Sequence, residues 1–234
     1  MNIAFAEISL AKPGALAVLV TEGTALRGIA ADLDDKLGGA LKRAVKAAGF
    51  TGKAGSFLEL VGPQGVSASR ILLAGLGKSA DVSAANLEKA GGELVGRIGK
   101  ASEASLSIVL DGISAPKLTA AEAAARVAFG ARLRSYKFDK YKTKKKDDSK
   151  KAELKSVTVM TRAVAAARKD YGTLSKVADG MALARDLVNT PASDLGPAEL
   201  CDAALRLFAD HGGRAHVIEG EALLAEGFPM VHAV

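Results

Sequence analysis

The sequence has no tryptophan, a single cysteine (Cys201) and only 4% aromatic residues. One cysteine cannot form an internal disulfide, which excludes the disulfide-stabilised class and fits a reducing compartment. Apolar residues nevertheless make up 49% of the chain, so a core of Ala, Leu, Val and Ile can form. Global disorder is excluded for the same reason.

Long apolar runs are also absent. No stretch approaches the roughly 18 uninterrupted apolar residues of a membrane span. The start of the chain, Met1–Phe5, lacks the basic region and the apolar run of a signal peptide. These absences predict a cytoplasmic protein with no membrane partner. A length of 234 residues allows one large or two ordinary domains.

The net charge of +6 comes from one segment, because residues 134–155 hold ten Lys/Arg and four Asp/Glu. Three aromatic residues, Tyr136, Phe138 and Tyr141, are expected to pin the start of this segment to the domain. The lysine run that follows is typical of a solvated loop. It could instead bind DNA weakly by neutralising phosphates, although Asp147 and Asp148 weigh against this. The lysines concerned are Lys142, Lys144, Lys145, Lys146, Lys150 and Lys151.

Apolar runs and helical stripes alternate up to residue 162. The patterns predict strands over 2–8, 15–21, 56–61, 70–74, 105–110 and 154–160, and helices over 33–48, 83–98 and 119–133. The run 15–20 is continuously apolar, which suits a strand buried on both faces. Thr119 and Glu122 form a capping box at the start of the last helix. The alternation predicts an α/β layered fold around a buried sheet.

A different organisation is expected from residue 163 onward. A helix over 163–188 runs into Asn189-Thr190-Pro191 and must stop there, and Pro197 can start the next helix over 198–208. A strand over 215–218, a short helix and an apolar run over 227–234 follow. We interpret that last run as a strand cut short. The predicted domains are 1–162 and 163–234.

The motif Gly77-Lys78-Ser79 follows a predicted strand and could suggest a phosphate-binding loop. That loop needs a glycine five positions before the Gly of Gly-Lys-Ser, and position 72 is leucine. An ordinary glycine-rich turn between strand and helix is therefore the favoured interpretation.

Cysteine and histidine offer little chemistry. Cys201 lies at helical spacing with Ala204, Leu205 and Phe208, so we interpret it as a small core residue rather than a nucleophile. A metal site shared by the three histidines is an open alternative, but structural or surface roles are favoured. The three histidines are His211, which is expected at a helix end, His216 and His232. No carboxylate pair stands at catalytic spacing, so we predict no catalytic, cofactor-binding or metal-binding residue.

Two stretches carry a family resemblance. The segments 184–191, 195–197 and 221–229 resemble the opening of the catalytic domain of the leucyl (cytosol) aminopeptidases, peptidase family M17. Residues 131–144 resemble the end of the N-terminal domain of that family. The resemblance implies a macro-domain-like, three-layer N-terminal domain, a connecting helix and an incomplete second α/β domain.

The resemblance also implies a cytoplasmic, hexameric exopeptidase that removes residues such as leucine from peptides. Family members use two divalent ions, zinc or manganese, to polarise the carbonyl and activate a bridging water. Their ligands come from a Lys…Asp pair near a Gly-Gly turn and from an Asn-Thr-Asp-Ala-Glu-Gly-Arg run. Neither is found here, because Asn189-Thr190 is followed by Pro191.

We therefore expect an N-terminal segment of a metalloaminopeptidase that binds no metal itself and is inactive alone. Two alternatives stay open. In the first, the segment is a non-catalytic binding module for a nucleotide-like ligand, or for DNA through its lysine loop. In the second, it is a remnant without a function of its own.

Overall fold

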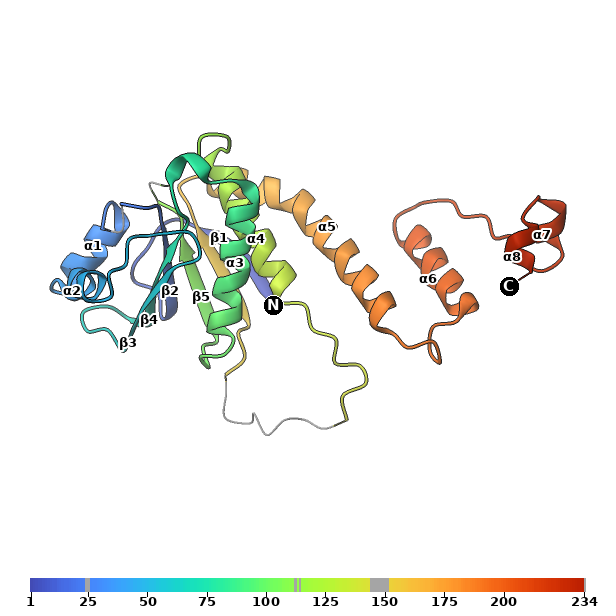
Figure 1. Cartoon of the computed structure of the whole chain (residues 1–234), viewed down its shortest axis with the longest axis horizontal. Helices are drawn as coiled ribbons and strands as arrows, with labels where there is room; N and C mark the ends of the chain where they lie inside the picture. Colours follow the sequence, from blue (N-terminus) through green and yellow to red (C-terminus); the bar gives the residue numbers. More distant parts are fainter. Residues whose placement is uncertain (24–25, 112, 114, 144–151, 234) are drawn as a thin grey trace. The chain divides into compact units, whose positions relative to one another are not determined.

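The computed structural model describes residues 1–23, 26–111, 113, 115–143 and 152–233 (Figure 1). The chain divides into two compact units, Met1–Ala182 and Leu183–Val234. Unit 1 contains the sheet and its covering helices, and unit 2 consists of helices and connecting segments.

A six-stranded sheet with the order β1-β6-β5-β2-β4-β3 forms the centre of unit 1. β3 pairs antiparallel with β4, whereas every other pair is parallel. All six strands lie where the sequence predicts strands, with ends that differ by one or two residues. Their bounds are β1 Asn2–Ala6, β2 Gly14–Val20, β3 Phe57–Val61, β4 Ala68–Gly75, β5 Ser105–Val109 and β6 Ser156–Met160.

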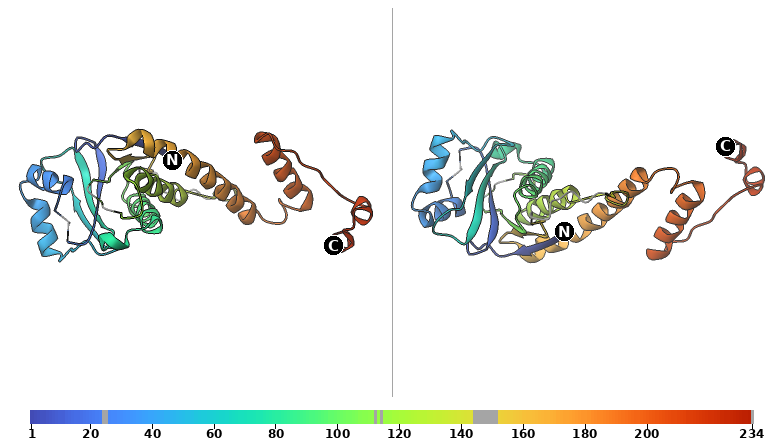
Figure 2. Two further views of the ribbon diagram at one scale, coloured as in Figure 1. Left: turned by 90° about the horizontal axis from the view of Figure 1, so that it is seen from above. Right: turned by 90° about the horizontal axis from the view of Figure 1, so that it is seen from below.

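Both faces of the sheet are covered, which gives three layers (Figures 1 and 2). β2 shows the division, because Ala17 and Leu19 belong to one apolar cluster and Leu16 and Val18 to the other. Successive side chains of a strand point to opposite faces, so a continuously apolar strand serves two cores. The helices on one face are α1 Ile29–Lys36 and α2 Ala40–Ala47, and those on the other are α3 Ala84–Ile98 and α4 Ala120–Arg134.

The prediction of one continuous helix over residues 33–48 is wrong. Two helices, α1 and α2, occupy this region and are separated by Gly38 and Gly39, with φ of +57° and +77°. Glycine adopts this left-handed conformation without steric cost, so the pair breaks the helix. The four-residue spacing of Leu33, Leu37 and Leu41 persists across the break because all three still face the core.

α3 and α4 approach each other through glycines. A Cβ at Gly91 would lie 2.1 Å from the Val127 carbonyl oxygen, and one at Gly130 would lie 1.8 Å from the Glu88 carbonyl oxygen. The predicted capping box at Thr119 is confirmed, and Ser83 with Asn86 forms a second one at α3. These features fix both helices over the sheet.

α5, Val164–Asn189, begins in unit 1 against β1 and α4. The ring centres of Tyr171 and Phe5 lie 5.5 Å apart. Burial raises the pKa of Tyr171. Arg132 Nη2 lies 3.0 Å from Asp179 Oδ1. The helix ends at Asn189, as the following Thr-Pro predicts. The two units divide inside this helix, while a domain boundary between residues 162 and 163 stays a prediction.

Unit 2 contains α6 Pro197–Asp210, α7 Ala222–Ala225 and α8 Pro229–His232, and none of its described residues is buried. Two strand predictions here are wrong: residues 215–218 form no strand, and the run after Gly227 contains α8 instead. A strand needs a neighbour for its backbone hydrogen bonds, and the described part of unit 2 offers none. A helix satisfies most of these bonds internally.

The prediction that Cys201 is a core residue is also wrong. Cys201 is half-buried, and α6 buries none of its residues. The helical spacing with Ala204 and Phe208 is present, but no second layer covers that face among the described residues of unit 2. Phe208, for example, is 45% exposed.

Candidate functional site

A small crevice lies where the sheet changes winding direction. The chain passes from β2 to β4 on one side and, through the next parallel crossover, to β5 on the other side. Ligands of open α/β sheets bind outside the carboxyl ends of strands at such a switch point. The crevice measures about 150 Å³ and is lined by Val18–Thr21, Arg27, Gly28, Asp111 and Ile113.

Asp111 provides the acidic side chain of the crevice. It follows β5, its side chain is 12% exposed, and its Oδ1 accepts a hydrogen bond of 3.1 Å from Arg162 Nε. Gly28 lies at the start of α1 with φ +55°, and a Cβ there would stand 3.3 Å from Asp111 Oδ2. The carboxylate therefore lies at the positive end of a helix.

This arrangement can accept hydrogen bonds from a small polar ligand through Asp111. It is smaller than the cavities of roughly 300 Å³ and more that enclose drug-sized molecules. The predicted alternative of a nucleotide-like ligand stays a prediction, and the crevice is where the fold favours one. Asp111 and Arg162 were not among the residues predicted from the sequence. Each lies just after the end of a strand, and this position is the signal that could have identified them.

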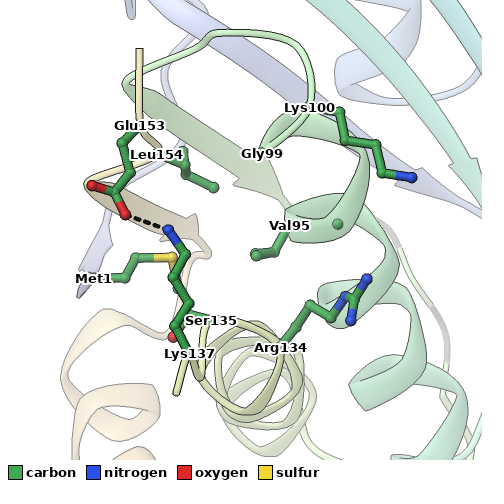
Figure 3. Close-up of a pocket in the computed structure, with 10 residues that line it drawn as sticks. Met1, Val95, Gly99, Lys100, Arg134, Ser135, Lys137, Glu153 and Leu154 are labelled. Carbon is green, nitrogen blue, oxygen red and sulfur yellow. Dashed lines mark hydrogen bonds and ion pairs between the residues drawn. The ribbon is translucent and has the colours of Figure 1, made fainter. Parts of the chain in front are cut away.

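A larger cavity, the α3–α4 hollow, lies at the carboxyl ends of α3 and α4 (Figure 3). Its volume is about 380 Å³. Its lining includes the apolar residues Met1, Val95 and Leu154. Lys137 and Glu153 lie on one side of the hollow, and Lys100 and Arg134 lie on the other side with their charged ends turned away from Val95 and Leu154.

Glu153 is tied to Lys137 by an ion pair on one side of the α3–α4 hollow (Figure 3). The hydrogen bond from the Lys137 ammonium, together with its charge, lowers the pKa of Glu153; the amino terminus and Lys155 add to this effect. The acid is therefore ionised at neutral pH and engaged by its neighbour. No signal in the sequence indicated this cavity, because its walls come from separate segments of the chain.

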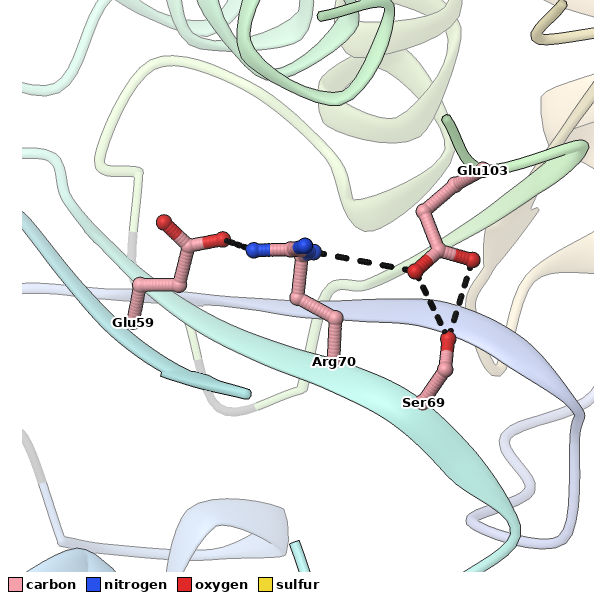
Figure 4. Close-up of polar contacts among 4 residues, drawn as sticks. All are labelled: Glu59, Ser69, Arg70 and Glu103. Atoms are coloured by element: carbon pink, nitrogen blue, oxygen red, sulfur yellow. Dashed lines mark hydrogen bonds and ion pairs between the residues drawn. The ribbon is translucent and has the colours of Figure 1, made fainter. Parts of the chain in front are cut away.

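A polar cluster on the sheet has a structural role (Figure 4). Arg70 on β4 pairs with Glu59 on β3, and its Nε lies 3.6 Å from Glu103 Oε1, within ion-pair range but too far for a hydrogen bond. Ser69 Oγ donates to both carboxylate oxygens of Glu103 at 2.9 Å. The cluster links the edge strand β3 to the segment before β5. Its charged side chains therefore pair with one another rather than with a ligand.

The Gly77-Lys78-Ser79 segment is a turn, as expected. β4 ends at Gly75, the short helix η1 covers Ser79–Asp81, and Lys78 is exposed. The Gly77 N–H donates to the Gly52 carbonyl at 2.9 Å. The Gly77 N–H therefore binds a neighbouring loop, whereas a phosphate-binding loop would direct its N–H groups at a phosphate.

The three histidines lie in unit 2. His211 ends α6, with Nδ1 3.0 Å from the Leu207 carbonyl oxygen, so its predicted position at a helix end is confirmed. His232 Nε2 lies 3.5 Å from Glu221 Oε1, and His216 is exposed. Among the described residues, no group of three or more His, Cys, Asp or Glu side chains could hold a metal ion.

The basic segment is described only in part. Tyr136 and Phe138 are half-buried, and the centres of the Phe138 and Tyr141 rings lie 5.8 Å apart. Lys142 is exposed and pairs with Asp139, whose pKa it lowers. The remaining lysines of the predicted DNA-binding set lie outside the described residues. They are Lys144, Lys145, Lys146, Lys150 and Lys151.

No helix in the described ranges is long and apolar enough to cross a membrane.

Comparisons with known proteins give a consistent result. The model of the N-terminal domain of the cytosol aminopeptidase family matches residues 17–145. A probable cytosol aminopeptidase of Rhodopseudomonas palustris is 44% identical over 170 residues, which are 71% of this chain and 33% of that protein. A probable cytosol aminopeptidase of Xanthobacter autotrophicus is 35% identical over 227 residues, which are 97% of this chain and 45% of that protein.

Solved structures agree with the fold. A mutant of tomato leucine aminopeptidase superposes with a TM-score of 0.73 at 22% identity, over 91% of this chain and 43% of that one. The bottromycin maturation enzyme BotP, in complex with Mn, gives a TM-score of 0.68 at 26% identity, over 91% of this chain and 40% of that one.

The chain thus spans between 33% and 45% of the length of these two curated relatives. The family model covers more than half of its residues and falls on the sheet-containing unit. The chain therefore belongs to the cytosol aminopeptidase family, and its residues 17–145 are the N-terminal domain of that family.

Proposed function

We propose that this chain is the N-terminal part of a metal-dependent aminopeptidase that releases N-terminal residues such as leucine from peptides. The match of residues 17–145 to the family's N-terminal domain is the observation that carries the proposal. In this proposal unit 1 carries no catalytic residue, and the chemistry belongs to the part of the relatives that this chain does not span. On its own the chain is inactive.

Two divalent ions, manganese or zinc, would supply the chemistry by polarising the scissile carbonyl and activating water. The described residues do not fit such a pair, because they offer no cluster of His, Cys, Asp or Glu ligands. The BotP structure in complex with Mn supports a metal-dependent parent. We derive no catalytic step through this chain, and assign it no catalytic, cofactor or metal residue.

The exposed apolar residues of unit 2 support an incomplete second domain. Val188, Phe208 and Met230 are 85%, 45% and 80% exposed, respectively. In the complete enzyme these side chains pack into the catalytic domain. A cytoplasmic location, supported by the relatives' names, and a hexameric assembly, implied by the family resemblance, belong to the same proposal.

The test is a domain replacement. The first 45% of the Xanthobacter relative, which aligns with this chain, is exchanged for residues 1–234. We expect the chimera to hydrolyse a leucine chromogenic amide with added manganese. The isolated 234-residue chain should give no hydrolysis above buffer, because it lacks the ligand set.

The unmodified relative is the positive control, and the relative without its first 45% is the matched negative control. A folded, hexameric chimera without activity would contradict the parent function. Manganese-dependent turnover by the isolated chain, removed by EDTA, would contradict its proposed inactivity.

A further inference from the structure

The outer edge of β3 carries a row of backbone groups that face no neighbouring strand. β3 is the last strand of the sheet and pairs with β4. Just beyond its end, the Gly62 N–H donates to the Ser69 carbonyl at 2.9 Å. Antiparallel pairs alternate between bonded and non-bonded residues, so the backbone groups of Phe57, Glu59 and Val61 point away from β4. Within the described part of the chain, these three residues make no backbone hydrogen bond outside the sheet.

β3 lacks the features that normally block such an edge. Natural edge strands are protected by proline, lysine, a β-bulge or a covering segment. Phe57–Val61 contain neither proline nor lysine, and their register with β4 is unbroken. The one charged side chain, Glu59, is directed back over the sheet, where it pairs with Arg70 (Figure 4). Val61 is 67% exposed, so the edge is open to a further strand.

An open groove, the β3 groove, lies beside this edge on the face that carries α3. Its volume is about 700 Å³. The side chains of Phe57, Glu59 and Val61 lie on this face, because Phe57 packs against the α3 cluster and every second residue of a strand points the same way. The charged side chains of the lining are Glu59, Lys89, Glu93, Arg97, Lys100 and Arg134.

The β3 groove has a positive balance of charge. Both of its acids already have partners, Glu59 in the polar cluster and Glu93 with Lys89 at 3.9 Å. Arg97 is exposed, and the ion pairs found among the described residues do not include it. Its guanidinium carbon lies 3.9 Å from the centre of the Phe57 ring. This cation–π contact holds a positive charge over the first residue of β3.

We propose that β3 binds an extended acidic peptide segment of a partner protein by antiparallel strand addition. The peptide backbone bonds to the outer edge of β3, and every second side chain lies on the α3 face. An acidic side chain beside Phe57 binds Arg97, and an apolar side chain covers Val61. Backbone bonds supply affinity in this mode and side-chain contacts supply specificity. The site does not depend on the proposed peptidase function.

A second copy of the chain is the competing occupant of this edge. Symmetric antiparallel pairing about the middle of β3 would place Glu59 opposite its own equivalent. Like charges directly opposite each other destabilise a strand pair. A peptide with a neutral residue at that position avoids the repulsion, and its acidic residue is complementary to the groove.

The probe is a synthetic heptapeptide, Thr-Val-Val-Thr-Val-Glu-Thr, with a fluorescent dye on its amino end and an amide on its carboxyl end. In antiparallel pairing its first valine, central threonine and glutamate lie opposite Val61, Glu59 and Phe57. Fluorescence anisotropy with the full chain measures binding. We expect one saturable site, and affinity lower by roughly threefold or more when lysine replaces the glutamate, because attraction to Arg97 becomes repulsion.

Backbone methylation of the probe tests strand addition directly, since an N-methyl group removes one amide donor. The amides of the first valine, central threonine and glutamate face β3 in antiparallel pairing. Methylating these three should lower the affinity by roughly tenfold or more, the effect of losing several hydrogen bonds. The amides of the alternate residues face away, and methylating them should leave the affinity unchanged.

Two variants test the chain itself. Val61→Pro removes an outward N–H and no bond to β4, and edge strands tolerate proline at such positions. It should weaken the probe by roughly threefold or more while circular dichroism shows an intact fold. Arg97→Gln should weaken the glutamate probe and not the lysine probe. Arg168→Gln is the matched control, because Arg168 is an exposed cation on α5, which packs against β1 at the opposite edge of the sheet.

Several results would overturn the proposal. The first is a lack of saturation. The second is an equal effect of the two methylation patterns, or a loss from the outward pattern alone; this result is readable on the unmodified chain even if Val61→Pro does not fold. The third is an equal loss in Arg97→Gln and Arg168→Gln. A dimer seen by sedimentation that disappears in Val61→Pro would assign the edge to a second copy instead.

Discussion

Gly130 shows how strongly one residue can constrain this fold. A Cβ at this position would lie 1.8 Å from the Glu88 carbonyl oxygen and 2.5 Å from its carbon, both backbone atoms that cannot rotate away. Gly130→Ala must therefore push α4 from α3, and we expect a loss of about 1–3 kcal/mol in the free energy of unfolding. Urea unfolding followed by circular dichroism measures this.

Gly172→Ala in α5 is the matched control for that substitution, since a methyl group added there would meet nothing within 4 Å. Alanine there should raise stability by up to about 1 kcal/mol through helix propensity. If both variants unfold at the same urea concentration, the close approach of α3 and α4 is not what the geometry indicates.

Such a requirement could not be predicted from the sequence. Gly130 sits in an alanine-rich helix with no local reason for a glycine, and the carbonyl that excludes a methyl group belongs to residue 88 on another helix. Glycines in loops are different. Gly49 follows α2 with φ +59°, the helix end that its position predicts.

At the scale of elements, the two capping boxes allow a test by pH. Glu122 Oε2 accepts hydrogen bonds from the Thr119 N–H at 2.7 Å and from the Thr119 hydroxyl at 2.9 Å. The backbone bond and then the hydroxyl lower the pKa of Glu122. Its contribution to stability is therefore present above the unfolded pKa, about 4.3, and is lost as pH falls through the lower folded value.

Thr119→Ala should cost about 1 kcal/mol at pH 7, and less at acidic pH, where Glu122 is protonated in both states. Ser83→Ala is the matched control because its partner, Asn86, does not titrate. The cost of that variant should be the same at both pH values. Alanine keeps the backbone N–H that donates to Glu122, so the variant removes only the hydroxyl bonds. A Thr119→Ala cost that does not change with pH, measured by urea unfolding, would contradict a contribution of the hydroxyl bond to the Glu122 carboxylate.

A helix or strand could be predicted from the sequence where its own residues show the pattern that defines it. β2 is apolar on both faces, and α4 begins with a complete capping box, so both were placed within two residues. The strand predicted over residues 215–218 failed because a strand depends on a neighbour, which short-range alternation cannot supply. Helix continuity over 33–48 failed because two adjacent glycines outweighed the apolar stripe.

Sites are properties of the whole molecule and were less predictable. Asp111 and Gly28 meet at the switch point although they are far apart in the chain, and Arg134 meets Gly96 across two helices. The parallel order of the strands, which brings the first pair together, follows only from topology. A phosphate loop at Gly77 could be rejected from the sequence alone, because that motif is local.

The two units should differ sharply in hydrogen exchange. Unit 1 has buried clusters on both faces of its sheet, whereas residues 183–233 include no buried side chain. Amides of β2 should exchange slower than in a free peptide by roughly a thousandfold or more, because exchange there requires global unfolding. Those of α6 should stay within about tenfold of free-peptide rates, because an isolated helix of its length is marginal.

Mass spectrometry of deuterium uptake by the full chain measures this contrast, and the complete Xanthobacter relative is the matched control. Its segment equivalent to α6 should be protected, because the rest of that protein can cover the apolar face that carries Leu200 and Phe208 here. Protection of α6 in the 234-residue chain equal to that of β2 would show that unit 2 has a core of its own. Its exposed leucine and phenylalanine side chains would then need another explanation than a missing partner domain.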